Sequence, residues 1–426
     1  MDTAMRTARN ATLEDLAAIL QAQKAEQLDI VAPAATLRSK AGVLHVEGIG
    51  NPAITESGVT PGIGTFRPTA VFDEGLAEKL QIPVGYLRRM REQRPDLYDL
   101  NINGLLHGKS VRRAGGGVEV IHPADDRKFL LRLFRGDEGG DEGGEGVARA
   151  MLSDSYKTID NLDILTAILS VVQASHMQVE IEKADLTDRR MYLDMIAPQM
   201  AALAPVLLGG YRNPFEDPRI EGRRRGAGRP EGELEYWRSV AERDGMAYDP
   251  GTEPVVYAGV RISNSEVGGG AFSIVPRLIL QVCRNGMTIS QDVVRHVHLG
   301  GKLDTGLIEW SETTQRKQLE LIMGKTADTL RAFLNPEFLA SKLDKIEADA
   351  GKPVDEPTKT IEIVGKSCGF TKAETHNVLD LFIRGGQMTA GGVANAITAY
   401  SQLVDDADRA GELDAQALRA MELVPA

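Results

Sequence analysis

Residues 255–282 read VVYAGVRISNSEVGGGAFSIVPRLILQV, and this stretch decides the fold. In its first half Val256, Ala258, Val260 and Ile262 alternate with other residues, which is the period of a β-strand with two distinct faces. A glycine-rich turn leads into a second run with the same alternation. The stretch therefore predicts an antiparallel hairpin that is packed on one face and solvated on the other.

Two flanking regions extend this hairpin into a larger sheet. Residues 177–184 and 189–197 form a further predicted hairpin around the turn at 185–188, and its second arm alternates in the same way. A long helix predicted at 308–334 offers apolar residues that can cover the dry face of the sheet. We expect an α+β fold, an antiparallel β-meander covered by a long helix, with helical N-terminal and C-terminal additions.

The rest of the chain is divided by changes in composition. The expected regions are a mixed, mostly helical N-terminal region at 1–110, a central α+β core at 111–350, a small C-terminal helical unit at 358–404 and a charged tail at 405–426 that frays. Two segments without apolar periodicity interrupt the core, the acidic loop 136–146 and the Arg-rich loop 212–232.

Composition excludes several classes of protein. With 42% hydrophobic and 26% charged residues in 426, the chain is neither disordered throughout nor a rod nor a membrane channel. Two cysteines, Cys283 and Cys368, cannot build a disulfide scaffold and are typical of a reducing cytoplasm. The start of the chain lacks a secretory signal. We therefore expect a cytoplasmic protein without a membrane partner.

Motifs for catalysis are weak. The tripeptides that begin at Gly108, Gly324 and Gly365 match the end of a phosphate-binding loop, but each lacks the glycine five positions earlier. His296 and His298 have a spacing that two metal ligands on a strand could use, although two ordinary strand histidines are the simpler interpretation. Cys283 is similarly interpreted as a small buried residue. We expect no cofactor, no metal and no catalytic residues, and hence no enzyme.

Cationic and aromatic side chains alternate on the predicted wet face of the sheet, as on a platform for single-stranded nucleic acid. The candidate contacts are Arg190, Tyr192, Tyr257, Arg261, Arg277, Arg284 and Arg295, with the loop cluster Arg223, Arg224 and Arg225. The loop cluster fits equally well a solvated loop whose charge is half cancelled by nearby acidic residues. The net charge of −12 speaks against binding of polyanions by the whole surface.

Three short motifs carry a resemblance. Residues 262–272 hold an Asn-Ser-x-x-Gly turn that is followed by Cys-x-Asn at 283–285, residues 152–161 end in Tyr-Lys-Thr-Ile-Asp-Asn, and residues 392–400 hold Asn-Ala-Ile-Thr-Ala-Tyr. In these motifs, from about Arg149 to Tyr400, the chain resembles the phage/plasmid-like family catalogued as domain of unknown function 932. The resemblance implies a phage or prophage context, and with it the cytoplasm of a bacterial host cell. In topology alone, a meander capped by a long helix also resembles single-strand annealing proteins of the RecT, ERF and Rad superfamily.

The leading hypothesis is an ATP-independent phage protein that binds single-stranded DNA and promotes annealing or recombination as a ring or filament of identical subunits. Its C-terminal helical unit could recruit a host single-strand-binding protein. The alternative is a structural or host-interaction phage protein without nucleic-acid binding, which the acidity favours. A hydrolase or transferase comes third and needs a pocket that gathers His296, His298 and acidic groups. The DNA hypothesis requires that the arginines of the sheet face be accessible.

Overall fold

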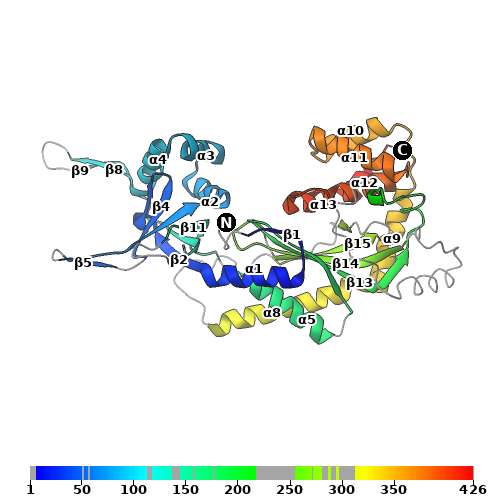
Figure 1. The fold of residues 1–426 in the computed structure, drawn as a ribbon, viewed down its shortest axis with the longest axis horizontal. Coiled ribbons are helices and arrows are strands. Elements are labelled where there is room, and N and C mark those ends of the chain that lie inside the picture. The colour runs from blue at the N-terminus through cyan, green and yellow to red at the C-terminus, as the bar shows by residue number, and fades with distance from the viewer. Residues whose placement is uncertain are drawn as a thin grey trace.

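The structure is a computed structural model that describes residues 6–49, 52–55, 58–112, 118–136, 144–156, 159–175, 178–216, 255–270, 272–280, 286–288, 294–296 and 312–425. Helices and sheets both contribute, which confirms the α+β class (Figure 1). An N-terminal lobe and a larger central unit lie side by side along the long axis of the molecule, and each has its own sheet.

The central sheet is the predicted meander. Within the described residues it has seven antiparallel strands in the order β1-β12-β13-β14-β15-β16, and β17 also pairs with β15. The strands are β1 (Ala8–Ala11), β12 (Glu180–Leu186), β13 (Met191–Leu203), β14 (Val255–Asn264), β15 (Phe272–Leu280), β16 (Gly286–Thr288) and β17 (Val294–His296). The register places Leu193 opposite Ile262 and Asp194 opposite Arg261, so each face keeps the residues that the alternation assigned to it.

Three helices cover one face of this sheet, namely α1 (Leu13–Glu26), α5 (Asn161–Ser175) and α8 (Glu312–Phe333) (Figure 1). Leu193, Val260 and Ile262 are fully buried in the same core as Leu330 of α8. The predicted long helix over the sheet is therefore confirmed. Helix α1 begins at a side-chain N-cap, because the Thr12 side chain accepts a hydrogen bond from the Asp15 N–H at 3.1 Å.

C-terminal helices lie over the opposite face (Figure 1). Helices α9 (Pro336–Ala350), α12 (Ala390–Ser401) and α13 (Ala407–Glu422) contact the strands, while α11 (Lys372–Gly385) packs on α12 and α10 (Pro357–Ser367) packs on α11. Helices α10, α11 and α12 fall in the region expected as a helical unit at 358–404. The expectation of a fraying tail at 405–426 is wrong, since α13 buries Leu413, Ala417 and Ala420 completely. Small apolar residues at helical spacing give this charged segment a buried face.

The N-terminal lobe differs from its prediction as well. Its sheet has the order β2-β10-β11-β7-β4-β3 in the described residues, with β11 and β7 parallel. The strands are β2 (Gln27–Pro33), β3 (Leu37–Lys40), β4 (Val43–Glu47), β7 (Ile63–Pro68), β10 (Lys128–Phe134) and β11 (Gly146–Ser153), and the helices are α2 (Ala70–Leu80), α3 (Val84–Gln93) and α4 (Pro95–His107). The lobe is not mostly helical, and the boundary expected at residue 110 cuts through its sheet, because the apolar strands β10 and β11 complete it.

Two ribbons project from the outer end of this lobe, away from the central unit (Figure 1). One is the β5–β6 hairpin (Ala53–Thr55 and Gly58–Thr60) and the other is the β8–β9 hairpin (Lys109–Arg112 and Val118–His122). Each is an isolated two-stranded sheet. Across the described part of the chain, no helix has the length and apolar character needed to cross a membrane.

Candidate functional site

The predicted binding platform is buried. Tyr192, Tyr257, Arg261 and Arg277 are each at most 7% exposed, so the expectation that they face solvent is wrong. Helix α13 lies on Tyr192, Arg261 and Arg277, and the Tyr192 hydroxyl donates a hydrogen bond to Asp408 at 2.6 Å. Tyr257 is buried in a separate small cluster with Ile196 and Ile279.

Two further contacts show how closely this face is covered. A Cβ atom at Gly411 of α13 would lie only 3.3 Å from Nη1 of Arg261, which shows how near the helix comes to the sheet. Arg190, at the start of the same strand, donates from Nε to the Gly269 carbonyl at 2.7 Å. The side chains that were expected to contact DNA are instead engaged within the protein.

The positive charges of the arginines on this face are also balanced by buried carboxylates. Arg261 donates two parallel hydrogen bonds to Asp194, at 2.6 and 2.7 Å, and Arg277 bridges Asp194 and Asp414, with a distance of 2.6 Å to the latter. Burial alone would raise the pKa of Asp194, but the two guanidinium groups outweigh it and hold that pKa well below its usual range. Arg261, Arg277, Asp194 and Asp414 therefore form a buried ion-pair set, with Lys183 at its edge 3.5 Å from Asp194, and we call it the face network.

The remaining candidates cannot be placed at this face. Arg223, Arg224, Arg225 and Arg284 lie outside the described residues. Arg295 belongs to β17, where its backbone lies opposite Ser273, but its side chain is outside the described set. The same limit applies to Cys283 and His298, and His296 is described only through its strand pairing with Phe272.

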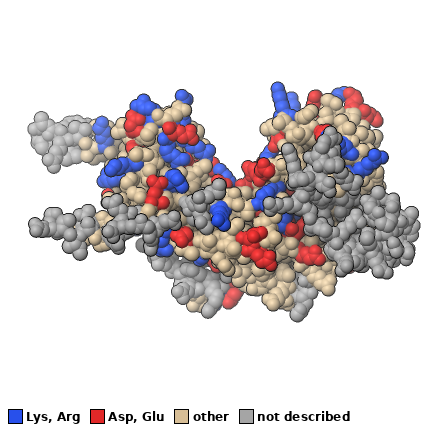
Figure 2. Space-filling view, viewed as in Figure 1, with Lys and Arg blue, Asp and Glu red and all other residues tan. Residues whose placement is uncertain are grey.

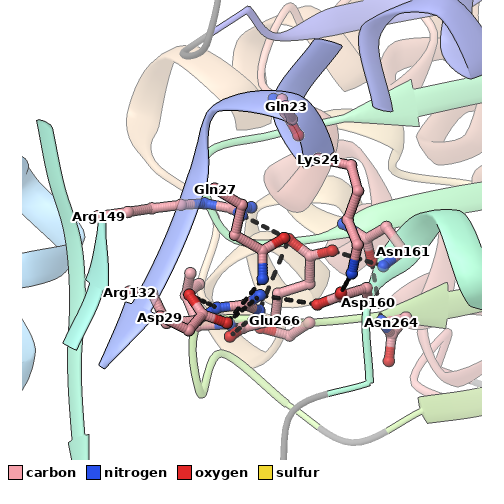
Figure 3. Close-up of polar contacts among 12 residues, drawn as sticks. Gln23, Lys24, Gln27, Asp29, Arg132, Arg149, Asp160, Asn161, Asn264 and Glu266 are labelled. Carbon is pink, nitrogen blue, oxygen red and sulfur yellow. Dashed lines mark hydrogen bonds and ion pairs between the residues drawn. The ribbon is translucent and has the colours of Figure 1, made fainter. Parts of the chain in front are cut away.

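A second set of charges joins the two units, with four buried members and with Lys24 and Asp29 at its exposed edge, and we call it the junction cluster (Figure 3). Its members are Lys24, Asp29, Arg132, Arg149, Asp160 and Glu266. Arg132, which is 1% exposed, contacts Asp160 at 2.7 Å and Asp29 at 2.9 Å and donates to the Glu266 carbonyl at 3.0 Å. The Glu266 carboxylate accepts from Arg149 and from the Asn161 N–H, both at 2.5 Å.

The electrostatics of the junction cluster fix its charge state. Burial opposes ionisation of Arg132, but Glu266, Asp29 and Asp160 raise its pKa. Burial likewise opposes ionisation of Asp160, whereas Arg132 and Lys24 lower its pKa overall. Arg132 therefore stays protonated and Asp160 stays ionised near neutral pH, each stabilised by its ion-pair partners. The cluster therefore holds the two units together rather than supplying an acid or base.

The polar residues of the resemblance motifs have structural contacts. Asn264 donates from Nδ2 to Oδ1 of Asn161 at 2.8 Å, so two motifs meet beside the junction cluster (Figure 3). Asn395, in the third motif, is buried and donates to the Leu207 carbonyl at 3.0 Å and to Gln387 at 2.9 Å.

Sequence reasoning missed the junction cluster and the partners of the face network. One signal was available, namely a single charge inside an otherwise apolar strand. Arg132 in KFLLRLF and Asp194 in MYLDMIA both have this pattern. Such a charge is buried only with a partner, so each pointed to an internal ion pair.

Two surface features remain accessible. Figure 2 shows a hollow between the N-terminal lobe and the C-terminal helices, with Lys and Arg on the wall formed by the lobe. Between the two units Arg189 donates to Glu74 of α2, at 2.5 and 2.7 Å. The projecting hairpins are the second feature. At the hairpins and the start of β7, Val59, Ile63, Val120 and Ile121 are 68%, 55%, 62% and 54% exposed.

Comparisons with known proteins add no assignment. Neither the family models nor the curated proteins nor the solved structures contain a match to this chain. Among the described residues, no group of three or more His, Cys, Asp or Glu side chains could hold a metal ion.

Proposed function

We propose that this protein is an assembly protein that associates with copies of itself through the projecting hairpins of its N-terminal lobe. The observation that carries this proposal is the exposure of large apolar side chains, Val59, Val120 and Ile121, on isolated ribbons. A two-stranded ribbon is marginally stable in water and gains stability when another surface covers it.

The burial of the face network speaks against DNA as a partner of this face and so favours a protein partner. Arg261 and Arg277 were the central candidates for phosphate contacts, and both are paired with carboxylates inside the protein. Exposing them would require removal of α13, whose Leu413 and Ala417 are part of the main core. We further propose a phage or prophage setting for this assembly, and this part of the proposal rests on the resemblance of the three short motifs alone.

The test is the mass of the protein in solution, measured by light scattering after size exclusion over a hundredfold range of concentration. The wild type is expected to form an oligomer. A Val120→Asp, Ile121→Asp double variant is expected to dissociate at least tenfold more readily with an unchanged circular dichroism spectrum.

Ile383→Asp is the matched control, because Ile383 is 56% exposed on α11 at the other end of the molecule. A monomeric wild type, or a hairpin variant that associates as the wild type does, would overturn the proposal.

Binding of single-stranded DNA is the second candidate, and the hollow with its cationic wall in Figure 2 is the observation that favours it. Contacts with phosphates weaken steeply with salt. Shift assays at two salt concentrations should therefore compare the wild type with the Arg223→Ala, Arg224→Ala, Arg225→Ala variant. They should include Arg89→Ala, since Arg89 is exposed on α3 and donates to Gln93 of the same helix at 3.2 Å. No shift at micromolar protein would exclude this candidate.

A further inference from the structure

The edges of the N-terminal sheet differ in how they are protected. An uncovered edge strand offers unpaired N–H and C=O groups to another strand. The edge at β3 is closed by α4, because the Ser39 N–H donates to Asn103 at 2.8 Å and Asn103 donates back to the Ser39 carbonyl at 2.7 Å. Asp99 accepts from the Ala41 N–H at 2.6 Å. Helix side chains thus occupy this edge.

The described edge strand β1 of the central sheet is protected by irregularity. It has only four residues, and its register with β12 shifts between Ala8 and Ala11. Asn10 has a positive φ of 52°, which bends the strand out of a regular ladder. Such an edge is a poor template for a further strand.

Within the described residues, the edge at β2 is neither occupied by helix side chains, as β3 is, nor made irregular, as β1 is. Its seven residues pair with β10 without a register shift. Hydrogen bonds from the Ala34 N–H to Arg127 and from the Arg135 N–H to Glu26, at 3.0 and 2.8 Å, bracket this ladder. Since the bonds in an antiparallel pair alternate, the backbone groups of Asp29 and Val31 point away from β10.

The side chains along this edge suit an apolar strand with basic flanks. Val31 is 52% exposed and the acidic Glu26 is also exposed, whereas the Asp29 carboxylate between them is already paired with Arg132 at 2.9 Å. On the β8–β9 hairpin, Val120 and Ile121 are exposed, and the exposed Lys109 lies opposite His122 at the base. Strand β9 has five residues, against seven in β2, so its length matches most of the edge.

The hairpin projects outward from its own lobe (Figure 1), so it is placed to reach another molecule. We propose that the β8–β9 hairpin of one copy adds to the free edge of β2 in a second copy. The inference rests on the proposed function and names the acceptor surface. Because donor and acceptor are different surfaces, each copy can both give a hairpin and receive one. The contact is therefore heterologous and builds rings or filaments, or closes as a reciprocal dimer.

The test uses Val31→Pro in the full-length chain. The Val31 N–H points away from β10, so proline removes an outward donor and leaves the internal ladder intact. The variant is expected to dissociate at least tenfold more readily in sedimentation experiments. Val31→Thr keeps the N–H and the branched side chain and should associate as the wild type does. Should Val31→Pro fail to fold, Val31→Lys blocks the same edge by charge without a change in the backbone.

Mixing provides the sharper measurement. The Val31→Pro variant keeps the donor hairpin, and the Val120→Asp, Ile121→Asp variant keeps the acceptor edge. Each alone should remain monomeric, and a 1:1 mixture should form heterodimers and nothing larger. A mixture that stays monomeric would contradict the inference. If the Val120→Asp, Ile121→Asp variant dissociates while Val31→Pro and Val31→Lys assemble as the wild type does, the acceptor edge is wrong and the proposed function stands. If the Val120→Asp, Ile121→Asp variant assembles as the wild type does, both this inference and the proposed function fail.

Discussion

At the residue scale, the buried charges are the features with the largest energetic consequences. Asp194 is 2% exposed and serves two guanidinium groups. A buried ion pair contributes little net stability compared with an apolar replacement, but loss of one partner leaves an uncompensated charge. The face network therefore affects the stability of the fold mainly when one of its members is removed.

We expect Asp194→Ala to lower the free energy of unfolding by about 3–5 kcal/mol, because Arg261 and Arg277 would lose a shared anion in the interior. Chemical denaturation measures this change. Asp380→Ala is the control, since Asp380 is 49% exposed and pairs with Arg384 on the surface, where a pair contributes about 0.3–0.5 kcal/mol. Equal effects of the two substitutions would show that the face network is not tightly buried.

Glu374 links α11 to α13, and this contact makes the stability of the protein depend on pH. The hydrogen bond from Arg409, with those from the Thr371 backbone, lowers the pKa of Glu374 to about 2. A lowered pKa in the folded state means stability that is present above the usual carboxyl pKa and is lost as pH falls toward 2. The stability difference between wild type and Glu374→Gln, followed by urea unfolding from pH 6 to pH 3, should shrink below about pH 4.5. A constant difference would rule out this linkage.

At the element scale, helices approach strands closely where glycine allows it. Gly75 in α2 faces β11, and a Cβ atom there would lie 2.3 Å from the Met151 carbonyl oxygen. Gly104 in α4 has open space in the same direction. The two glycines lie in the same lobe and inside helices, so they form a matched pair.

Gly75→Ala should therefore destabilise the protein, because α2 must move off the sheet. Gly104→Ala should stabilise it by about 0.5–1 kcal/mol, because alanine favours the helix and meets no neighbour. Melting temperatures of the two variants test this pair. A stabilised Gly75→Ala variant would contradict the close packing of α2 on β11.

At the scale of the whole molecule, the junction cluster couples two units that each have a sheet and a core. The two main cores contain separate sets of residues, and Arg132, Arg149 and Glu266 connect the units between them. Such coupling is expected to make the two units unfold together as long as the ion pairs remain.

Glu266→Gln should weaken this coupling, because the amide cannot neutralise Arg149 and Arg132. Calorimetry is expected to show one transition in the wild type and two in the variant. Glu47→Gln is the control, since Glu47 pairs with Arg38 on the surface, with both side chains at least 40% exposed. If Glu266→Gln keeps a single transition at the temperature of the wild type, the junction cluster does not couple the units.

The sequence by itself determined the long strands of the central sheet, their period and the grouping of residues on each face. The alternation puts Val260 and Ile262 on one face, and the register places them opposite Met195 and Leu193 on that face. Strand alternation is a local property of the backbone, so it can be read without knowledge of the fold. Helix α1 and the long helix over the sheet follow from the same kind of local pattern.

Only the tertiary structure decided what lies on each face. Alternation shows which side chains share a side of a sheet, but not whether water or a helix covers that side. The cover comes from α13, and the contact between Tyr192 and Asp408 joins residues 216 positions apart. A pairing at that separation leaves no local pattern, and for this reason a face expected to hold DNA is a buried ion-pair network in the folded protein.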